Sequence, residues 1–272
     1  VYAVQANCSI IQVFLAGFLP GFLVMALYSG YIAIWSLLNP GRTPPAEPPM
    51  SIGERISESL KLIPCLLLII FVFLSLLMGW ATATECAAWG VLGSLAIAWW
   101  QDALSWESFW ASVMGATRVN CMILLILAGA SYMGTSMAYT GIPMALASWV
   151  NSLQLSPYAL IAALTVMYIV LGTALDGISM IVLTTAIVIP MVKQAGFDLV
   201  WFGIFLVLVV EMAEVSPPVG FNLFVLQTMS GKDSNTVAKA SLPFFFLLVL
   251  AVAIITVFPS IVMVLPQMAF PG

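Results

Sequence analysis

The chain of 272 residues contains no histidine, and charged residues account for only 7% of it. The absence of histidine excludes imidazole metal ligands and histidine general bases. Soluble domains carry roughly 25% charged residues. A chain that is 63% hydrophobic therefore lacks the polar side chains needed to cover a surface in water. This composition predicts a protein whose surface faces lipid.

The sequence is also poor in cysteine. Its four cysteines, Cys8, Cys65, Cys86 and Cys121, share no metal-type spacing, and each lies in or beside an apolar run. We interpret them as small apolar side chains rather than as disulfides or ligands. The sequence offers no pair of nucleophile and base and no metal-ligand set, so we expect no enzyme. The net charge of −4 is too small and scattered to indicate a nucleic-acid partner.

Long apolar runs dominate what is present. A bilayer core about 30 Å thick needs ~20 apolar residues in each crossing helix, so these runs predict an all-α, polytopic membrane protein. Expected spans cover residues 10–35, 62–80, 119–139 and 241–265, with a shorter apolar run over 87–100. The Trp-rich segment 101–118 predicts a helix lying in the membrane interface, and 143–153 predicts a short helix.

The only long polar segment is 39–61, which is rich in proline and charge. It predicts a loop leading into a short amphipathic helix. Its basic residues, Arg42, Arg55 and Lys61, indicate that the loop is cytoplasmic. The chain starts at Val1, without Met or a signal-peptide charge pattern, and we expect it to be part of a longer polypeptide.

Two apolar runs in the last third of the chain are interrupted. The sequence Asp-Gly-Ile-Ser at 176–179 separates two apolar arms, each short for a full crossing, and Ser-Pro-Pro-Val-Gly at 216–220 breaks a second run. Lipid tolerates such backbone only where protein or a water cavity surrounds it. We interpret 158–192 as a re-entrant hairpin and 199–230 as a discontinuous helix. This topology places one more basic residue on the cytoplasmic side than two full spans would.

A weak internal repeat relates the two ends of the chain. Val4-Gln5 matches Leu226-Gln227, and Leu19-Pro20 matches Leu242-Pro243 with a one-residue gap. In the expected topology the two copies run in opposite directions, which makes an inverted repeat of the kind found in many secondary transporters. Chance can also produce a match of this length. If the repeat is real, an equivalent first half with its own broken helix precedes this chain.

The interruptions have the chemistry of transport sites. Discontinuous helices present N-terminal amides to anions and freed carbonyls to Na⁺, and an ionised carboxylate between apolar arms is costly and usually functional. The candidate Na⁺ ligands are Thr173, Asp176, Ser179, Val215, Ser216 and Gly220. The candidate substrate contacts are Gly177, Ser179, Pro218, Gly220 and Asn222.

Plainer interpretations remain open at this point. Asp176 can be an N-cap of the second arm, and the prolines can mark a simple kink in a packing helix. Glu211 and Glu214 lie three residues apart on one helix face, where two ionised carboxylates would repel each other. They are either a proton-coupling pair or structural groups near an aqueous cavity.

Several stretches resemble the large membrane subunit of tripartite ATP-independent periplasmic (TRAP) transporters. They read ATATECAAWG from Ala81, GASYMGTSMAYTGIPMALASW from Gly129, LDGISMIVLTTAIVIPMV from Leu175, GFDLVWFGIFLVLVVEMAEVSPPVGFNLFV from Gly196, and SLPFFF from Ser241. Family members usually have Thr-Pro-Thr-Glu where residues 82–85 read Thr-Ala-Thr-Glu, and often Thr-Pro-Pro-Val-Gly-Leu-Asn where 216–222 begin with Ser. Both changes are mild, because Ser keeps the hydroxyl oxygen.

The resemblance implies an elevator-type, Na⁺-driven importer of organic acids such as C4-dicarboxylates or sialic acids, located in the bacterial inner membrane. It also implies two partners, a small four-helix membrane subunit and a periplasmic substrate-binding protein. A proton-coupled carboxylate carrier and a non-transporting membrane scaffold are the alternatives. The chain then divides into a terminal span of a missing first repeat (1–38), the loop (39–61), spans and interfacial helices (62–157), the transport core (158–230), and the final span and tail (231–272).

Overall fold

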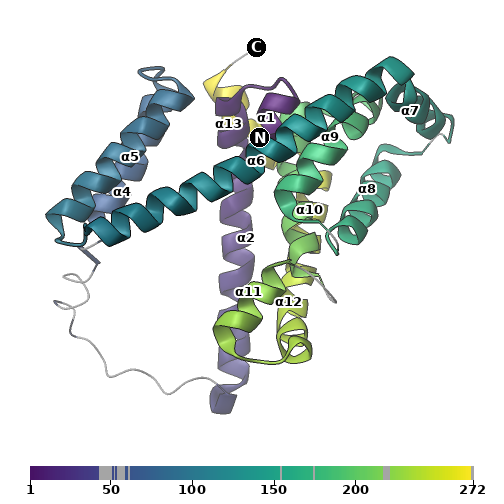
Figure 1. The fold of residues 1–272 in the computed structure, drawn as a ribbon. Coiled ribbons are helices and arrows are strands. Elements are labelled where there is room, and N and C mark those ends of the chain that lie inside the picture. Colours follow the sequence, from purple (N-terminus) through teal and green to yellow (C-terminus); the bar gives the residue numbers. More distant parts are fainter. Residues whose placement is uncertain are drawn as a thin grey trace. The chain divides into compact units, whose positions relative to one another are not determined.

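The computed structural model describes residues 1–42, 51, 53, 59–60, 62–153, 155–173, 175–216 and 221–270. The regular elements within these residues are all helical. They are α1 (Tyr2–Gln5), α2 (Ile10–Leu38), η1 (Pro40–Arg42), α4 (Ile63–Leu77), α5 (Ala83–Trp100), α6 (Trp106–Thr140), α7 (Ile142–Ser152), α8 (Pro157–Leu171), α9 (Gly177–Gln194), α10 (Leu199–Val215), α11 (Phe221–Ser230), α12 (Ser234–Val257) and α13 (Ser260–Ala269). The chain is all-α, as its apolar runs predict (Figure 1).

The chain forms two compact units, one of Val1–Trp35 with Ile123–Gly272 and one of Ser36–Met122. In the second unit α4 packs against α5. A capping box opens α5, because Glu85 Oε2 accepts from the Thr82 amide over 2.7 Å while Thr82 Oγ1 accepts from the Glu85 amide over 3.4 Å. Satisfying these free amides fixes where the helix begins.

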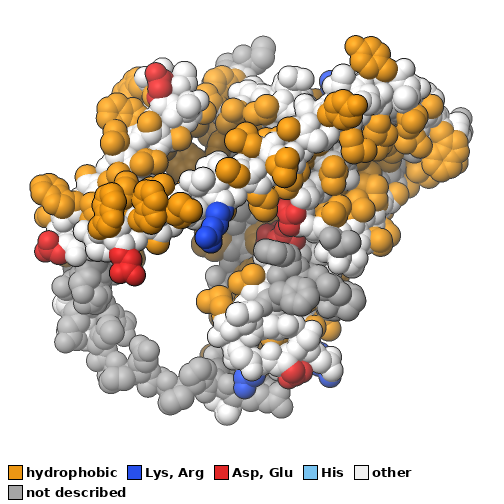
Figure 2. Space-filling model, viewed as in Figure 1, with side chains coloured by type: hydrophobic (Ala, Val, Ile, Leu, Met, Phe, Trp, Pro, Cys, Tyr) orange, Lys and Arg blue, Asp and Glu red, His pale blue; other side chains and the backbone are white. Residues whose placement is uncertain are grey.

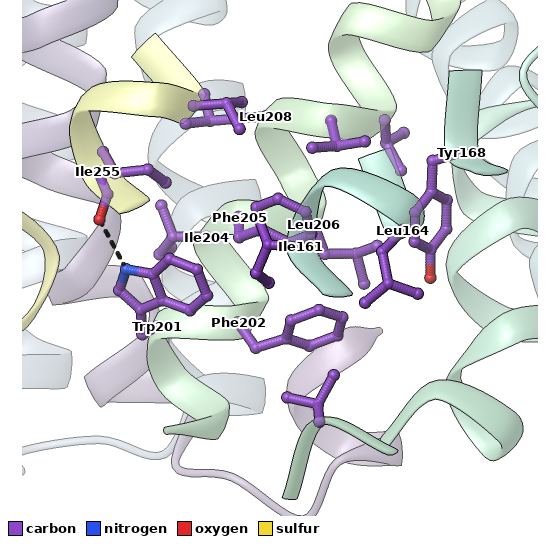
Figure 3. Packing of buried hydrophobic residues seen from close by; sticks show 14 of the residues in the cluster. Ile161, Leu164, Tyr168, Trp201, Phe202, Ile204, Phe205, Leu206, Leu208 and Ile255 are labelled. Carbon is purple, nitrogen blue, oxygen red and sulfur yellow. Dashed lines mark hydrogen bonds between the residues drawn. The ribbon is translucent and has the colours of Figure 1, made fainter. Parts of the chain in front are cut away.

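Helix α10 is the centre of the larger unit. It packs against α8, α9 and α12, and also touches α1, α11 and α13. Its residues are apolar around nearly the whole circumference and most of them are buried, as expected for a helix enclosed by others. Figure 3 shows the core around it, where Trp201 and Phe205 lie with their rings stacked 5.7 Å apart. The Trp201 indole donates a hydrogen bond to the Ile255 carbonyl of α12 over 3.0 Å.

Much of the surface is apolar. Figure 2 shows hydrophobic side chains over much of the visible face, with few charged groups. Exposed side chains include Trp99, Trp106, Leu125 and Tyr139. Within the described residues, four helices are long and apolar enough to cross a membrane: Ile10–Leu38, Trp106–Met137, Gly177–Gln194 and Ser234–Val257. The chain is therefore a multi-pass membrane protein.

Helix α6 differs from the sequence prediction. We expected an interfacial helix over 101–118 and a separate span over 119–139, and this division is wrong: one helix runs through Trp106–Thr140. No proline interrupts this stretch, and Arg118 alone does not end a helix. The stops lie outside it, at Asp102 and Gly141, which both have positive φ. Positive φ is incompatible with a continuing right-handed helix.

The last span also has different ends. The sequence places it at 241–265, but α12 begins at Ser234 and ends at Val257. The earlier start follows from Asp233, whose carboxylate accepts from the Thr236 amide over 3.0 Å and caps the helix. The earlier end precedes Pro259, after which α13 begins at Ser260. Pro243 lies inside α12 without ending it.

The predicted cytoplasmic loop over 39–61 lies mostly outside the described residues. Within them, Pro40–Arg42 form a single 3₁₀ turn, and α4 begins at Ile63 after Leu62. The short helix predicted at 143–153 corresponds to α7, Ile142–Ser152.

The two ends of the chain share one order of features. Near the N-terminus a short helix ends at Gln5, Asn7 has positive φ, and Ser9 accepts from the Gln12 amide over 3.4 Å at the start of a long helix. Near the C-terminus a short helix ends at Ser230, Gly231 has positive φ, and Asp233 accepts from the Thr236 amide over 3.0 Å at the start of another long helix. Each long helix contains one proline, Pro20 or Pro243. This order is what an internal repeat predicts.

Candidate functional site

The first interruption is a short turn between α8 and α9. Gly172 closes α8 with its amide bonded to the Tyr168 carbonyl over 2.9 Å. Asp176 caps α9, accepting from the Ser179 amide over 3.2 Å and also from the Ser179 hydroxyl. The sequence Asp-Gly-Ile-Ser thus starts α9, because its carboxylate satisfies an amide that lacks an intrahelical partner.

The two arms are tied to one another and to α10. The Tyr168 hydroxyl of α8 lies 2.6 Å from the Thr184 hydroxyl of α9, and α8 and α9 each pack on α10 (Figure 1). At 1.5 Å per residue, α8 with 15 residues is about 22 Å long, which is short for a bilayer core. Helix α9 with 18 residues is about 27 Å long and lies within the spanning range. The prediction that both arms are short for a full crossing is therefore wrong for the second arm, because α9 continues through Pro190 to Gln194.

Both ends of this turn press closely on the last turn of α10. A Cβ at Gly172 would lie 3.0 Å from the carbonyl carbon of Ala213. A Cβ at Gly177 would lie 2.7 Å from a methyl carbon of Val210 and 2.5 Å from Oε1 of Glu214. At Gly172 a side chain would meet backbone atoms of α10, so glycine is needed there, whereas at Gly177 it would displace the side chains of Val210 and Glu214.

Glu214 closes this contact with a hydrogen bond. Its Oε1 accepts from the Gly177 amide over 2.6 Å, across 37 residues of sequence. The first amide of α9 is therefore bonded to α10, and the amide of Ser179 to Asp176. Two carboxylates, Asp176 from the turn and Glu214 from α10, share the positive end of α9, an arrangement that the dipole of a helix stabilises.

The second interruption begins where α10 ends. Ser216 caps α10 in an extended conformation, with φ −76° and ψ 131°. It is buried, and its hydroxyl donates to the Ala213 carbonyl over 2.8 Å. Residues 217–220 lie outside the described residues, so the predicted positions of Pro218 and Gly220 do too. Helix α11 begins at Phe221.

Glu211 connects the two sides of this break. Its Oε1 accepts from the Asn222 side-chain amide over 3.3 Å. Asn222 is the second residue of α11, and Glu211 lies one turn before the end of α10. The two glutamates at the end of α10 thus have different partners, Glu214 at the start of α9 and Glu211 at the start of α11.

The structure brings several of the predicted Na⁺ ligands to one locality. Asp176 and Ser179 are hydrogen-bonded together at the start of α9. The Thr173 hydroxyl donates back to the Val170 carbonyl over 2.7 Å, which leaves its lone pairs outside that bond. Val215 and Ser216 end α10 directly after Glu214, the partner of Gly177. These residues remain predictions as ligands.

The predicted substrate contacts at α9 are already engaged. The Gly177 amide is bonded to Glu214 and the Ser179 amide to Asp176. A substrate carboxylate could use these amides only by displacing a carboxylate of the protein. The Asn222 side-chain amide, at the start of α11, is engaged as well, since it donates to Glu211.

Sequence reasoning missed the part of α10 that holds the turn. Val210 and Ala213 look like ordinary apolar residues, and the two glutamates look like a repelling pair. The available signal was the placement of Gly172 and Gly177 at both ends of the turn, since paired glycines indicate a close approach of another backbone. That signal does not say which helix approaches.

A known protein family matches most of the chain, including the two interruptions. The family described as "Tripartite ATP-independent periplasmic transporter, DctM component" matches residues 1–261. This match covers both interruptions, the whole of α10 and the N-terminal segment that contains α1 and α2.

Similar proteins include three permeases of TRAP transporters. The C4-dicarboxylate TRAP transporter large permease protein DctM of Pseudomonas aeruginosa is 27% identical over 98% of this chain and 62% of its own length. The sialic acid TRAP transporter permease protein SiaT of Haemophilus influenzae is 26% identical over 100% of this chain and 44% of its own. The ectoine TRAP transporter large permease protein TeaC of Halomonas elongata is 26% identical over 99% and 63%. The chain thus spans less than two thirds of these relatives.

Proposed function

Because this chain belongs to the DctM component family of tripartite ATP-independent periplasmic transporters, we propose that it is part of a permease that imports an organic acid together with Na⁺ by an elevator mechanism. It is not an enzyme, since its relatives are transporter permeases. The transport function, its ions and its partners are proposals that concern the whole protein.

The observation that carries this proposal is the meeting of two helix interruptions at one end of α10. The α8–α9 turn rests on Ala213 and Glu214, and the break after Val215 follows directly. Secondary transporters bind ions and substrates where discontinuous helices expose free amides and carbonyls near the membrane midplane. A simple proline kink would explain the break after Val215. It would not explain why the α8–α9 turn is bonded to the same end of α10, through the Gly177 amide and the Glu214 carboxylate.

For the ion, the proposed ligands are the oxygens that the sequence singles out at both interruptions. They are Thr173, Asp176, Ser179, Val215, Ser216 and Gly220. Hard oxygen ligands suit Na⁺ as they suit other hard cations. The Asp176 carboxylate supplies the negative charge, and the end of α10 supplies carbonyls that lack helical partners.

For the substrate, we place the carboxylate at the start of α11. The first amides of α9 are occupied by Glu214 and Asp176, so a substrate would have to displace one of them there. At α11 the Glu211 carboxylate bonds to the Asn222 side chain and not to a backbone amide. Free amides at a helix N-terminus bind carboxylates. Relatives named for C4-dicarboxylate and sialic acid make a carboxylate the substrate class that we propose.

The proposal includes a small four-helix membrane subunit and a periplasmic binding protein as partners, in the bacterial inner membrane. We also propose that α8 and α9 form a re-entrant hairpin, because α8, with 15 residues, is short for a helix that crosses a bilayer core.

Uptake into proteoliposomes tests the proposal. The full-length permease would be reconstituted with its membrane and periplasmic partners, and succinate and sialic acid would be offered as labelled probes. Uptake should require an inward Na⁺ gradient. Asp176→Asn should lower it at least tenfold, because Asn still caps α9 but carries no charge.

Asp233→Asn is the matched control. Asp233 caps α12 through Thr236 just as Asp176 caps α9 through Ser179, but it lies outside both interruptions, so uptake should persist. Uptake driven by a pH gradient without Na⁺ would replace the proposal with a proton-coupled carrier. Absence of uptake together with no ligand-dependent change in stability would indicate a scaffold.

A further inference from the structure

We propose that Glu214 is a positioning residue that fastens the α8–α9 turn to α10, and that Glu211 does the same for α11, so that the two interruptions keep a fixed spacing. This inference rests on the proposed function only where it concerns transport. Its structural part stands on the contacts of the described residues.

Glu214 makes a short hydrogen bond to the start of α9. Its Oε1 lies 2.6 Å from the Gly177 amide nitrogen, a short distance of the kind found when the acceptor is charged. Hydrogen bonds to charged groups are roughly twice as strong as neutral ones. Gly177 is buried, and losing the acceptor would leave its amide without this partner, which carries the full cost of desolvation.

Glu214 has a different role from Asp176, the residue that caps α9. Asp176 already caps α9 through Ser179 within a single turn of sequence, so α9 does not need Glu214 in order to begin. The Glu214 bond instead joins residues 37 apart. Its effect is therefore on the distance between the hairpin and α10, not on the existence of the helix.

Glu211 and Glu214 bond to different helices. The two glutamates lie three residues apart at the end of α10, yet one reaches Gly177 of α9 and the other Asn222 of α11. One helix end therefore holds the first residues of both helices that follow an interruption. This explains why two carboxylates stand on one apolar helix, since each has a separate donor.

Hydrogen–deuterium exchange on the intact full-length permease complex tests the assignment. Glu214→Ala should speed exchange in peptides covering 172–179 about tenfold, because the Gly177 amide loses a charged acceptor. Glu214→Gln should show a smaller increase, since its side-chain oxygen can still accept. Peptides covering 221–226 should not change in either variant.

Glu211→Ala is the matched control, one turn away on the same helix. It should alter peptides covering 221–226 and leave 172–179 unchanged. Unaltered exchange at 172–179 in both Glu214 variants, or the same pattern in Glu211→Ala as in Glu214→Ala, would overturn the inference. So would equal effects of Glu214→Gln and Glu214→Ala, since that would show that the hydrogen-bond acceptor is unimportant.

Uptake of labelled succinate by the same preparations separates this inference from the proposed function. Glu214→Ala should lower the maximal rate and Glu214→Gln should restore most of it. If the exchange pattern is as expected but the unaltered complex transports neither probe, the proposed function fails and the positioning role stands. If uptake is Na⁺-dependent but unaffected by Glu214→Ala, the role in transport is wrong.

Discussion

The Tyr2 hydroxyl donates a hydrogen bond to the Leu199 carbonyl over 2.7 Å, across 197 residues of sequence. Tyr2 is also the neighbour that keeps residue 203 small, because a Cβ at Gly203 would lie 2.5 Å from Cε1 of Tyr2. The short helix α1 thus packs on the first turn of α10, and the centre of the Tyr2 ring lies 6.3 Å from that of the Phe202 ring. The first residues of the described chain belong to the core.

Tyr2→Phe should lower the free energy of unfolding by about 1 kcal/mol, since it removes one hydrogen bond and keeps the ring. Tyr2→Ala should cost about 3–5 kcal/mol, because it also leaves a cavity beside Phe202. Thermal unfolding of the complex in detergent measures both. Equal stability of the two variants would mean that α1 does not belong to the core.

Gly172→Ala should destabilise the hairpin by about 1–3 kcal/mol, because the new methyl group would meet backbone atoms of α10 that cannot move aside. Gly115→Ala is the control. It places the same methyl group in α6, where no atom of the described residues lies within 4 Å apart from the adjacent backbone of α6 itself, and should be neutral or stabilising by up to about 1 kcal/mol. Melting temperatures of the two variants give the comparison, and similar losses in both would remove the steric argument.

Trp201→Phe should cost about 1–3 kcal/mol. The substitution leaves the Ile255 carbonyl without the indole donor 3.0 Å away, while an aromatic ring still stacks between Phe197 and Phe205. Trp201→Leu, which loses the stacking too, should be worse. Chemical or thermal unfolding checks the order, and a Phe variant as stable as the original would show that the hydrogen bond contributes little.

Acid should weaken the start of α12. Hydrogen bonds from the Thr236 side chain and amide hold the pKa of Asp233 below its ordinary value. A carboxylate with a lowered folded-state pKa contributes stability above its unfolded pKa, about 3.9. That contribution is lost as the pH falls through the folded pKa. Asp233→Asn should remove this acid-dependent part.

Comparing unfolding of the unaltered protein and Asp233→Asn at pH 6 and pH 3 tests this. The difference between the two proteins should shrink at pH 3, because this pH lies below the unfolded pKa of about 3.9, where the contribution of the charge declines. A difference that stays constant between the two pH values would contradict the role of the charge.

The sequence was sufficient for the interruptions, because glycine, proline and a capping aspartate act locally. Asp176 caps α9, and α10 ends at Val215 before the paired prolines. It was insufficient for the partner of each glutamate, because the 37-residue contact of Glu214 with Gly177 depends on how three helices pack. The same limit applies to α6, where an amphipathic stretch and an apolar one form a single helix since nothing between them stops it.

The contact of Gly172 with Ala213 has a consequence for how this chain can vary. Cores usually absorb a larger side chain by accepting a smaller one opposite, but here one partner is already glycine and the other alanine. Residue 213 therefore cannot grow at the expense of residue 172, which is already the smallest residue. Any enlargement at residue 213 must be accommodated by moving the hairpin, so this point sets the minimum distance between the two elements, and substitutions elsewhere have to adapt to it.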